Sequence, residues 1–270
     1  MFQKKKRYAI DELNAYKIAY GRPIAKEDYF LNIVLPACFG SAMIFLLLNS
    51  WLLMVLVGLG YAFYGYRVLF PLNIRRFYMH KAFDQRNRFI NNLTQLLSDP
   101  TMSWFIALQR ATERCEGEFR EDLDQLLVEL QEASSNEISQ HFQRFAEKYN
   151  NDVVFSLFIE QVETVALEGR TNIDMIRDIK TYHNQLREQT KQFMKRKKRI
   201  VDQLVLYVIM SSAILLIFHF FPLGYEVYLK SFAHSLIGWI TSGLYMLVLT
   251  LHLHKSCHCF YDDEIMEVTV

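Results

Sequence analysis

The stretch "YFLNIVLPACFGSAMIFLLLNSWLLMVLVGLGYAFYGY", residues 29–66, contains no Asp, Glu, Lys or Arg. A helix that crosses the hydrocarbon core of a bilayer needs about 20 apolar residues. The run is long enough for two such helices, with Asn49-Ser50 as the natural turn between them. It therefore predicts a transmembrane hairpin over residues 29–72. The two spans of this hairpin are expected at about 30–48 and 51–70.

A second apolar pair lies near the end of the chain. Residues 203–225 carry no Asp, Glu, Lys or Arg, and residues 231–254 are uncharged apart from three histidines. They predict a second hairpin over 201–254, because a soluble domain rarely buries four such runs. Its spans are expected at about 203–223 and 234–253.

Clustered cations set the expected orientation of these spans. Lys and Arg collect on the cytoplasmic side of short membrane-flanking segments, and here they precede the first span, follow the second and precede the third. Both termini, residues 1–28 and 255–270, and the central residues 73–200 are therefore expected in the cytoplasm. The densest cluster is interpreted as a membrane anchor that also attracts anionic lipid headgroups. Its members are Lys195, Arg196, Lys197, Lys198 and Arg199.

The same cluster resembles a nucleic-acid or nuclear-targeting signal, but its place beside a span already explains it. The whole chain has 30 basic and 29 acidic residues, so no basic excess points to a nucleic-acid partner.

The central residues show helical periodicity and no strand pattern. Apolar residues recur at the spacing of one buried helix face in six segments. These stripes lie within residues 89–97, 104–115, 119–130, 138–149, 154–166 and 173–193. Asp99-Pro100 predicts a helix start, and Ser134 with Glu137 predicts a capping box. The expected fold is an all-α polytopic membrane protein in which two transmembrane hairpins flank a cytoplasmic six-helix bundle.

The central segment is acidic, which raises the possibility of a docking surface. Residues 84–188 contain 19 acidic and 11 basic side chains, a difference of −8. The excess is densest in "ERCEGEFREDLD", residues 113–124. A solvated helix face explains this pattern, and a docking patch for a basic partner is the sharper hypothesis. The residues proposed for docking are Glu118, Glu121 and Asp122.

Motifs of known chemistry are missing from the sequence. It has no phosphate-binding loop, dinucleotide fingerprint, nucleophile elbow or zinc-protease motif, so no catalytic residue and no cofactor are expected. The segment "HLHKSCHCF", residues 252–260, contains weak candidates for a metal site: His252, His254, Cys257 and Cys259. A lipidated cysteine beside the membrane and a plain cytosolic tail are the alternatives.

Residues 83–200 and the number of flanking spans resemble the type II secretion system F-domain family, in particular the single-domain platform proteins of Tad-type pili. The resemblance rests on three segments: "FINNLTQLLSDPTMSWFIALQ" (89–109), "SSNEISQHFQRFA" (134–146) and "FIEQVETVALEGRTNIDMIRDIKTYHNQLREQ" (158–189). Ser98-Asp99-Pro100 stands where the family usually has a glycine between its first two helices.

The resemblance implies a non-enzymatic platform in the bacterial cytoplasmic membrane. It implies three kinds of partner besides the bilayer itself: a secretion ATPase, pilin-like subunits, and either a second platform subunit or another copy of this chain. Two alternatives stay open from the residues alone. One is a membrane-bound signalling adaptor, and the other is a transporter or membrane enzyme with a site among the spans.

Overall fold

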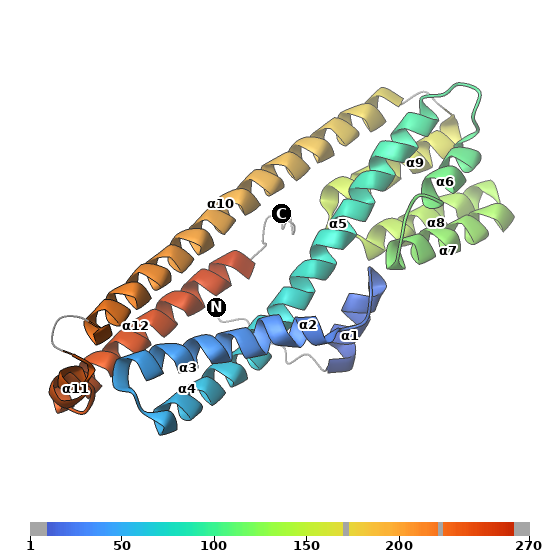
Figure 1. Cartoon of the computed structure of the whole chain (residues 1–270). Helices are drawn as coiled ribbons and strands as arrows, with labels where there is room; N and C mark the ends of the chain where they lie inside the picture. Colours follow the sequence, from blue (N-terminus) through green and yellow to red (C-terminus); the bar gives the residue numbers. More distant parts are fainter. Residues whose placement is uncertain (1–9, 170–172, 221–223, 262–270) are drawn as a thin grey trace. The chain divides into compact units, whose positions relative to one another are not determined.

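The computed structural model describes residues 10–169, 173–220 and 224–261. Every secondary-structure element in these residues is a helix (Figure 1), so the prediction of an all-α chain is confirmed. The chain divides into two compact units. The described residues of the first, here called the membrane unit, are 24–75 and 194–261 with the gap given above. Those of the second, the helical unit, are 10–23 and 76–193 with its gap.

Four helices in the described residues are long and apolar enough to cross a membrane. They run over Lys26–Leu48, Trp51–Leu97, Ile173–Ile217 and Leu236–Cys257. Each overlaps one of the four spans predicted from the sequence. Together they indicate a membrane protein.

The first apolar pair is built from five consecutive elements: α2 (Lys26–Tyr29), the π-helix η1 (Phe30–Val34), α3 (Leu35–Leu48), α4 (Trp51–Tyr64) and the π-helix η2 (Gly65–Leu69). Asn49 ends α3 with a φ of 48°, in the left-handed region that Asn tolerates better than most residues. Its N–H donates to the carbonyl of Phe45 at 2.8 Å. The structure thus confirms the predicted turn at Asn49-Ser50.

Small residues let the two spans of the first apolar pair approach each other closely, at the α3–α4 contact and at the η1–η2 contact. A Cβ atom at Gly40 would lie 2.6 Å from the ring of Tyr61. At Gly65 it would collide with the backbone carbonyl oxygen of Asn32. Helices in lipid associate mainly through van der Waals packing and interhelical hydrogen bonds, which favours small residues at their contacts. The glycines therefore have a packing role here.

The second apolar pair consists of α10 (Ile173–Phe220), α11 (Tyr225–Tyr228), the π-helix η4 (Leu229–Ala233) and α12 (Leu236–Tyr261). The Tyr228 hydroxyl donates to the carbonyl of Leu47 at 2.8 Å, and the Tyr245 hydroxyl donates to Ser211 Oγ at 3.0 Å. Apolar side chains of α3 and α12 form the buried core of the membrane unit. They are Met43, Ile44, Leu47, Leu48 and Met246.

The helical unit contains all six of the predicted stripes. They lie on the later part of α5 (Phe70–Leu97), on α6 (Trp104–Thr112), α7 (Glu118–Glu132), α8 (Ser135–Lys148), α9 (Val153–Glu168) and the first part of α10. All six contribute to one hydrophobic core. An additional helix, α1 (Ile10–Ala19), also belongs to this unit.

Aromatic rings fill the centre of that core. Phe89 of α5 is fully buried, and its ring makes edge-on contacts with three other phenylalanines. Those rings are Phe119 at 5.5 Å, Phe155 at 6.3 Å and Phe158 at 6.3 Å between centroids. Edge-to-face pairs add to the energy of simple area burial. The contacts join α5, α7 and α9.

Two predicted helix starts have different outcomes. Ser134 and Glu137 form the predicted capping box before α8, where the Ser134 N–H donates to Glu137 Oε2 at 2.8 Å. The prediction of a helix start at Asp99-Pro100 is wrong, because α6 begins at Trp104 behind Ser103. Asp99 Oδ1 instead accepts from the Thr101 N–H at 2.9 Å, so the aspartate stabilises a turn.

Leu123 and Val128 on α7 provide a test of the core assignment. Leu123 is fully buried and Val128 is 64% exposed. We expect Leu123→Ala to lower the free energy of unfolding of the helical unit by about 2–5 kcal/mol, because it leaves a cavity. Val128→Ala should change it by less than about 0.5 kcal/mol. Thermal unfolding of the full chain in detergent, followed by circular dichroism, checks both, and equal midpoints would contradict the assigned faces.

Candidate functional site

The acidic surface proposed for docking begins where α7 begins. Gly117 precedes the helix with a φ of 67°, a conformation that L-residues with side chains rarely adopt. A Cβ atom at this position would also collide with the carbonyl oxygen of Ala19. The start of α7 is therefore packed directly against the end of α1, and glycine is required there for two independent reasons.

Glu118 lies near three tyrosines: Tyr16 on α1, Tyr20 directly after α1, and Tyr78 on α5. The Tyr78 hydroxyl donates to Glu118 Oε2 at 2.9 Å. The rings of Tyr16 and Tyr20 lie 4.9 and 5.4 Å from that of Tyr78. Burial, and then the negative charge of Glu118, raise the pKa of Tyr20. Glu118 thus contributes to the packing of α1 on the helical unit.

Asp122 is also engaged within the helical unit. Its carboxylate lies 2.6 Å from Lys148 Nζ and accepts from the Tyr149 hydroxyl at 2.5 Å. Its side chain is only 13% exposed. Burial, followed by this hydrogen bond, raises the pKa of Tyr149, so the phenol stays a donor. These contacts join α7 to the end of α8.

Glu121 differs from the other two proposed docking residues because it is exposed. Three other acids in the same segment are exposed as well: Glu113, Glu116 and Asp124. Asp124 lies 3.6 Å from Arg120 one helical turn away, and an exposed pair of this kind is worth little. The acids of this segment that are open to a partner are therefore Glu113, Glu116, Glu121 and Asp124.

A line of polar contacts joins α5 to α10 within the helical unit. Arg187 Nη2 lies 2.9 Å from Asp84 Oδ1. Asn87 Nδ2 lies 2.8 Å from His183 Nδ1. Asn184 Nδ2 donates to Asn91 Oδ1 at 2.9 Å. These contacts, here called the α5–α10 seam, fix the axial register of two helices that are nearly a hundred residues apart in sequence.

His183 is fully buried in the seam. Its ring stacks on Phe83 with centroids 5.0 Å apart, and its Nε2 has no hydrogen-bond partner among the described residues.

Asp152 and Arg86 form another ion pair in the helical unit, with Arg86 Nε 2.8 Å from Asp152 Oδ2. Asp152 also accepts from the Phe155 N–H at the start of α9.

The proposed membrane anchor lies on α10. Four of its cations are exposed and Lys197 is 5% exposed. Successive residues of a helix are 100° apart, so five in a row surround the helix. The exposed members are Lys195, Arg196, Lys198 and Arg199.

The weak metal candidates lie at the end of α12. His254 Nδ1 is 2.8 Å from the Tyr64 hydroxyl, and Cys257 lines a cavity between the apolar helices. The side chain of Cys259 lies outside the described residues. Within the described part of the chain, no group of three or more His, Cys, Asp or Glu side chains is placed to hold a metal ion.

Cys115 is the buried cysteine of the helical unit. Burial raises the pKa of its thiol to about 12, and the thiol donates to the Ala111 carbonyl at 3.4 Å. A thiol rather than a thiolate is therefore present at neutral pH, and it would be a poor nucleophile. Its role is packing.

Charge reversal at neighbouring positions of α7 should separate structural from exposed acids. Asp122→Lys places a cation beside Lys148 and removes the acceptor of the Tyr149 hydroxyl. We expect it to lower the free energy of unfolding by at least about 1–3 kcal/mol. Glu121→Lys should stay within about 0.5 kcal/mol of the parent chain. Thermal unfolding of the full chain measures both, and a stable Asp122→Lys variant would show that its contacts contribute little.

Comparison with known proteins gives one clear relationship. No model of a known protein family matches the chain, and no solved structure matches it. The chain is 38% identical over 267 residues to the uncharacterized protein pXO2-23 of Bacillus anthracis, and the alignment covers 98% of this chain and 96% of that protein. Similarity at this level extends over both units. The chain therefore belongs to the same family as this Bacillus anthracis protein.

Proposed function

We propose that the chain is a non-enzymatic membrane platform of a type II secretion or Tad-type pilus assembly machine. In this proposal it couples a cytoplasmic secretion ATPase to the export or assembly of pilin-like subunits. The observation that carries the proposal is the order of its parts. After the short helix α1, two apolar helices are followed by the main part of a helical unit with its own core, and then by two further apolar helices. The resembling platform family has the same order.

Cation asymmetry supports a cytoplasmic position for the helical unit. Exposed cations lie on α10 before its apolar part, and Arg67 lies on η2 after α4. The turn at Asn49-Ser50 has no charged residue. By the positive-inside rule, both termini and the helical unit face the cytoplasm of a bacterium, and the chain is a multi-pass protein of the cytoplasmic membrane.

The α5–α10 seam supports a mechanical role. α5 and α10 contain residues of both units, and the seam joins them inside the helical unit through Asp84–Arg187 and the asparagine contacts. A force applied by a partner to the helical unit would therefore act on both helices together. The platform is proposed to work beside a second platform subunit or another copy of itself, and no nucleic acid has a role.

A signalling adaptor is the second candidate function. The unbroken 48 residues of α10 favour it, because a continuous helix can transmit a rotation or shift along its axis. The two candidates differ in partner: a platform binds a secretion ATPase, and an adaptor binds a sensor or output protein.

The proposed orientation can be tested by cysteine labelling from outside the cell. In a chain whose native cysteines are replaced, Glu226→Cys should react with a membrane-impermeant maleimide on intact cells, and Asp124→Cys should react only after lysis. Both positions are exposed, so access to solvent does not bias the comparison. The reverse pattern would contradict the proposed topology.

Docking of the ATPase is tested by charge reversal at the exposed acids. We expect Glu113→Lys, Glu116→Lys and Glu121→Lys, combined in the full chain, to weaken binding of the cognate secretion ATPase at low ionic strength. Charges at the rim of an interface act mainly on association rate and salt dependence. The Debye length falls from roughly 30 Å at 0.01 M to roughly 8 Å at 0.15 M salt, so the difference should shrink as salt rises. Titration of the ATPase against the parent chain and the triple variant, across a series of salt concentrations, measures this difference in affinity.

A matched control reverses three acids elsewhere on the helical unit. Glu160, Glu168 and Asp178 are exposed on α9 and α10, and changing them to Lys alters the net charge by the same amount. Equal weakening by both triple variants would show that net charge, and not this surface, controls binding. No binding by the parent chain at any salt concentration would contradict the platform proposal itself.

A further inference from the structure

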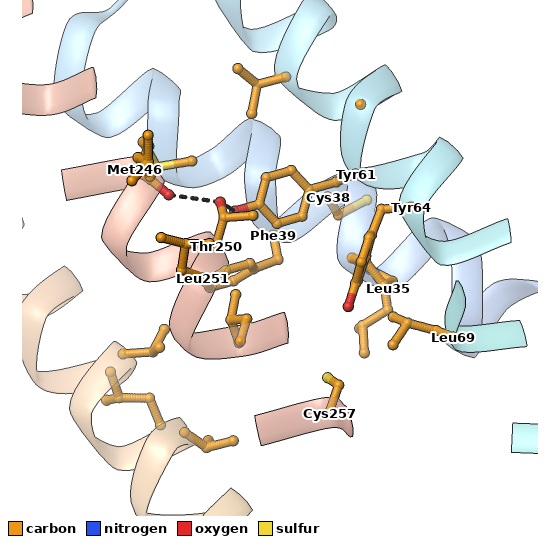
Figure 2. Close-up of a pocket in the computed structure, with 18 residues that line it drawn as sticks. Leu35, Cys38, Phe39, Tyr61, Tyr64, Leu69, Met246, Thr250, Leu251 and Cys257 are labelled. Atoms are coloured by element: carbon orange, nitrogen blue, oxygen red, sulfur yellow. Dashed lines mark hydrogen bonds between the residues drawn. The ribbon is translucent and has the colours of Figure 1, made fainter. Parts of the chain in front are cut away.

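The membrane unit contains a large apolar cavity. Its volume is about 1030 Å³, and it is lined by α3, α4, η2, α10 and α12 (Figure 2). Most lining side chains are hydrocarbon, including Leu35, Phe39, Val208 and Leu251. This volume is at the upper end of the range for ligand pockets, which is roughly 300–1,000 Å³. The cavity therefore has room for acyl chains.

The hydroxyl groups in the lining already have hydrogen-bond partners within the protein. The Tyr61 hydroxyl lies 2.6 Å from Thr250 Oγ1, which donates to the Met246 carbonyl at 2.7 Å (Figure 2). The Tyr64 hydroxyl lies 2.8 Å from His254 Nδ1. A polar ligand would lose its hydration in the cavity without gaining these partners. The interior therefore suits a hydrocarbon chain.

The cavity lies toward one end of the apolar helices. Its lining comes from the first half of α3, the second half of α4, the start of the apolar part of α10 and the second half of α12. Beyond those parts, each helix continues into charged residues. Among the described residues of the membrane unit, nine cations and three acids lie at this end.

The cations are Lys26, Arg67, Arg75, Lys195, Arg196, Lys197, Lys198, Arg199 and Lys255. The acids are Glu27, Asp28 and Asp202. Two of the cations are close in sequence to the lining itself. Arg67 lies between the lining residues Tyr64 and Leu69, and Lys255 lies between Leu253 and Cys257. Both are exposed.

The opposite end of the membrane unit has a different charge pattern. Its described charged residues are Glu226 and Lys230, which lie one helical turn apart. Lys230 Nζ is 3.9 Å from Glu226 Oε2. Their charges cancel. Only the end near the cavity carries an excess of positive charge.

We propose that this cavity is a binding site for one anionic diacyl phospholipid. Its two chains fill the apolar interior, and its phosphate lies among the cations at the end marked by Arg67 and Lys255. The excess of positive charge favours an anionic lipid, because a zwitterionic headgroup has no net charge and is attracted only weakly. The site does not depend on the proposed platform function, and its test uses no ATPase or pilin.

Native mass spectrometry of the delipidated full chain tests the headgroup. Phosphatidylglycerol and phosphatidylcholine with identical oleoyl chains are added separately, with glycerol phosphate as a third probe. Each Lys or Arg near an anionic headgroup is worth about fivefold in affinity. We expect one phosphatidylglycerol to bind at least about fivefold more tightly than phosphatidylcholine, and glycerol phosphate not to bind. Equal binding of the two lipids, or binding of glycerol phosphate, would overturn the proposal.

Arg67→Gln and Lys255→Gln test the cations. Each substitution should lower the affinity of the chain for phosphatidylglycerol by about fivefold. The affinity for phosphatidylcholine should stay unchanged. Unchanged phosphatidylglycerol binding in the double variant would show that these cations do not hold the phosphate, which overturns the proposal. A covalent acyl group found on Cys257 in the intact mass would identify a different occupant and would also overturn it.

Two matched glycines test the apolar interior. A Cβ atom at Gly60 or at Gly243 meets no heavy atom within 4 Å, but only Gly60 lines the cavity. Gly60→Leu should reduce phosphatidylglycerol binding at least tenfold, and Gly243→Leu should preserve it. Equal binding by both folded variants would overturn the proposal.

A second measurement needs no variant. Phosphatidylglycerol with a photoactivatable acyl chain should crosslink the parent chain at residues 205–209 and 246–251. Crosslinks confined to other segments would overturn the proposed site, even if Gly60→Leu failed to fold.

Discussion

In the hydrocarbon core of a bilayer, each backbone N–H and C=O must find its hydrogen bond within the protein. The backbone of the membrane unit follows this constraint, although the buried Ser242 Oγ has no hydrogen-bond partner among the described residues. Its described spans are helical throughout, and hydroxyl side chains such as Ser212 and Thr250 bond back to carbonyls of their own helices. The Tyr228 hydroxyl reaches the carbonyl of Leu47 at the end of α3. Helix association then depends on interhelical hydrogen bonds of this kind and on close packing at Gly40 and Gly65.

Charge in the helical unit has two separate uses. Glu118, Asp122 and Asp152 hold helices together through partners on other elements. Glu113 and Glu121 are exposed on the outside of the unit. Fewer acids are therefore available to a partner than the composition of the segment suggests, because some of them are paired with other helices of the unit.

The sequence predicted the helices better than the contacts between them. Hydrophobic periodicity placed six stripes on six helices, because burial depends on spacing alone. The starts of α6 and α8 show the limit. Ser134 and Glu137 form the capping box that their local pattern predicts. Asp99 could cap a helix or stabilise a turn, and in the structure it accepts from the Thr101 N–H in a turn.

Contacts between distant residues carried no comparable signal. Nothing in the local pattern pairs Tyr78 with Glu118 or Asp122 with Tyr149, and nothing places α1 against Gly117. Similarly, the residues of the α5–α10 seam look like ordinary polar helix positions. One weak signal was present, since Gly117 interrupts a charged helical segment, and a glycine with positive φ often marks a close backbone approach.

The unbroken α10 has a consequence for how this family can vary. Its 48 residues extend over about 72 Å at 1.5 Å per residue. Inserting or deleting a single residue would rotate everything beyond it by about 100°. Within the membrane unit, such a change would turn the side chains beyond it away from their partners, such as Met43 for Ser212 and Tyr245 for Ser211. Evolution of this helix is therefore restricted to substitutions and to length changes near whole numbers of turns, whereas the loops of the chain can change length one residue at a time.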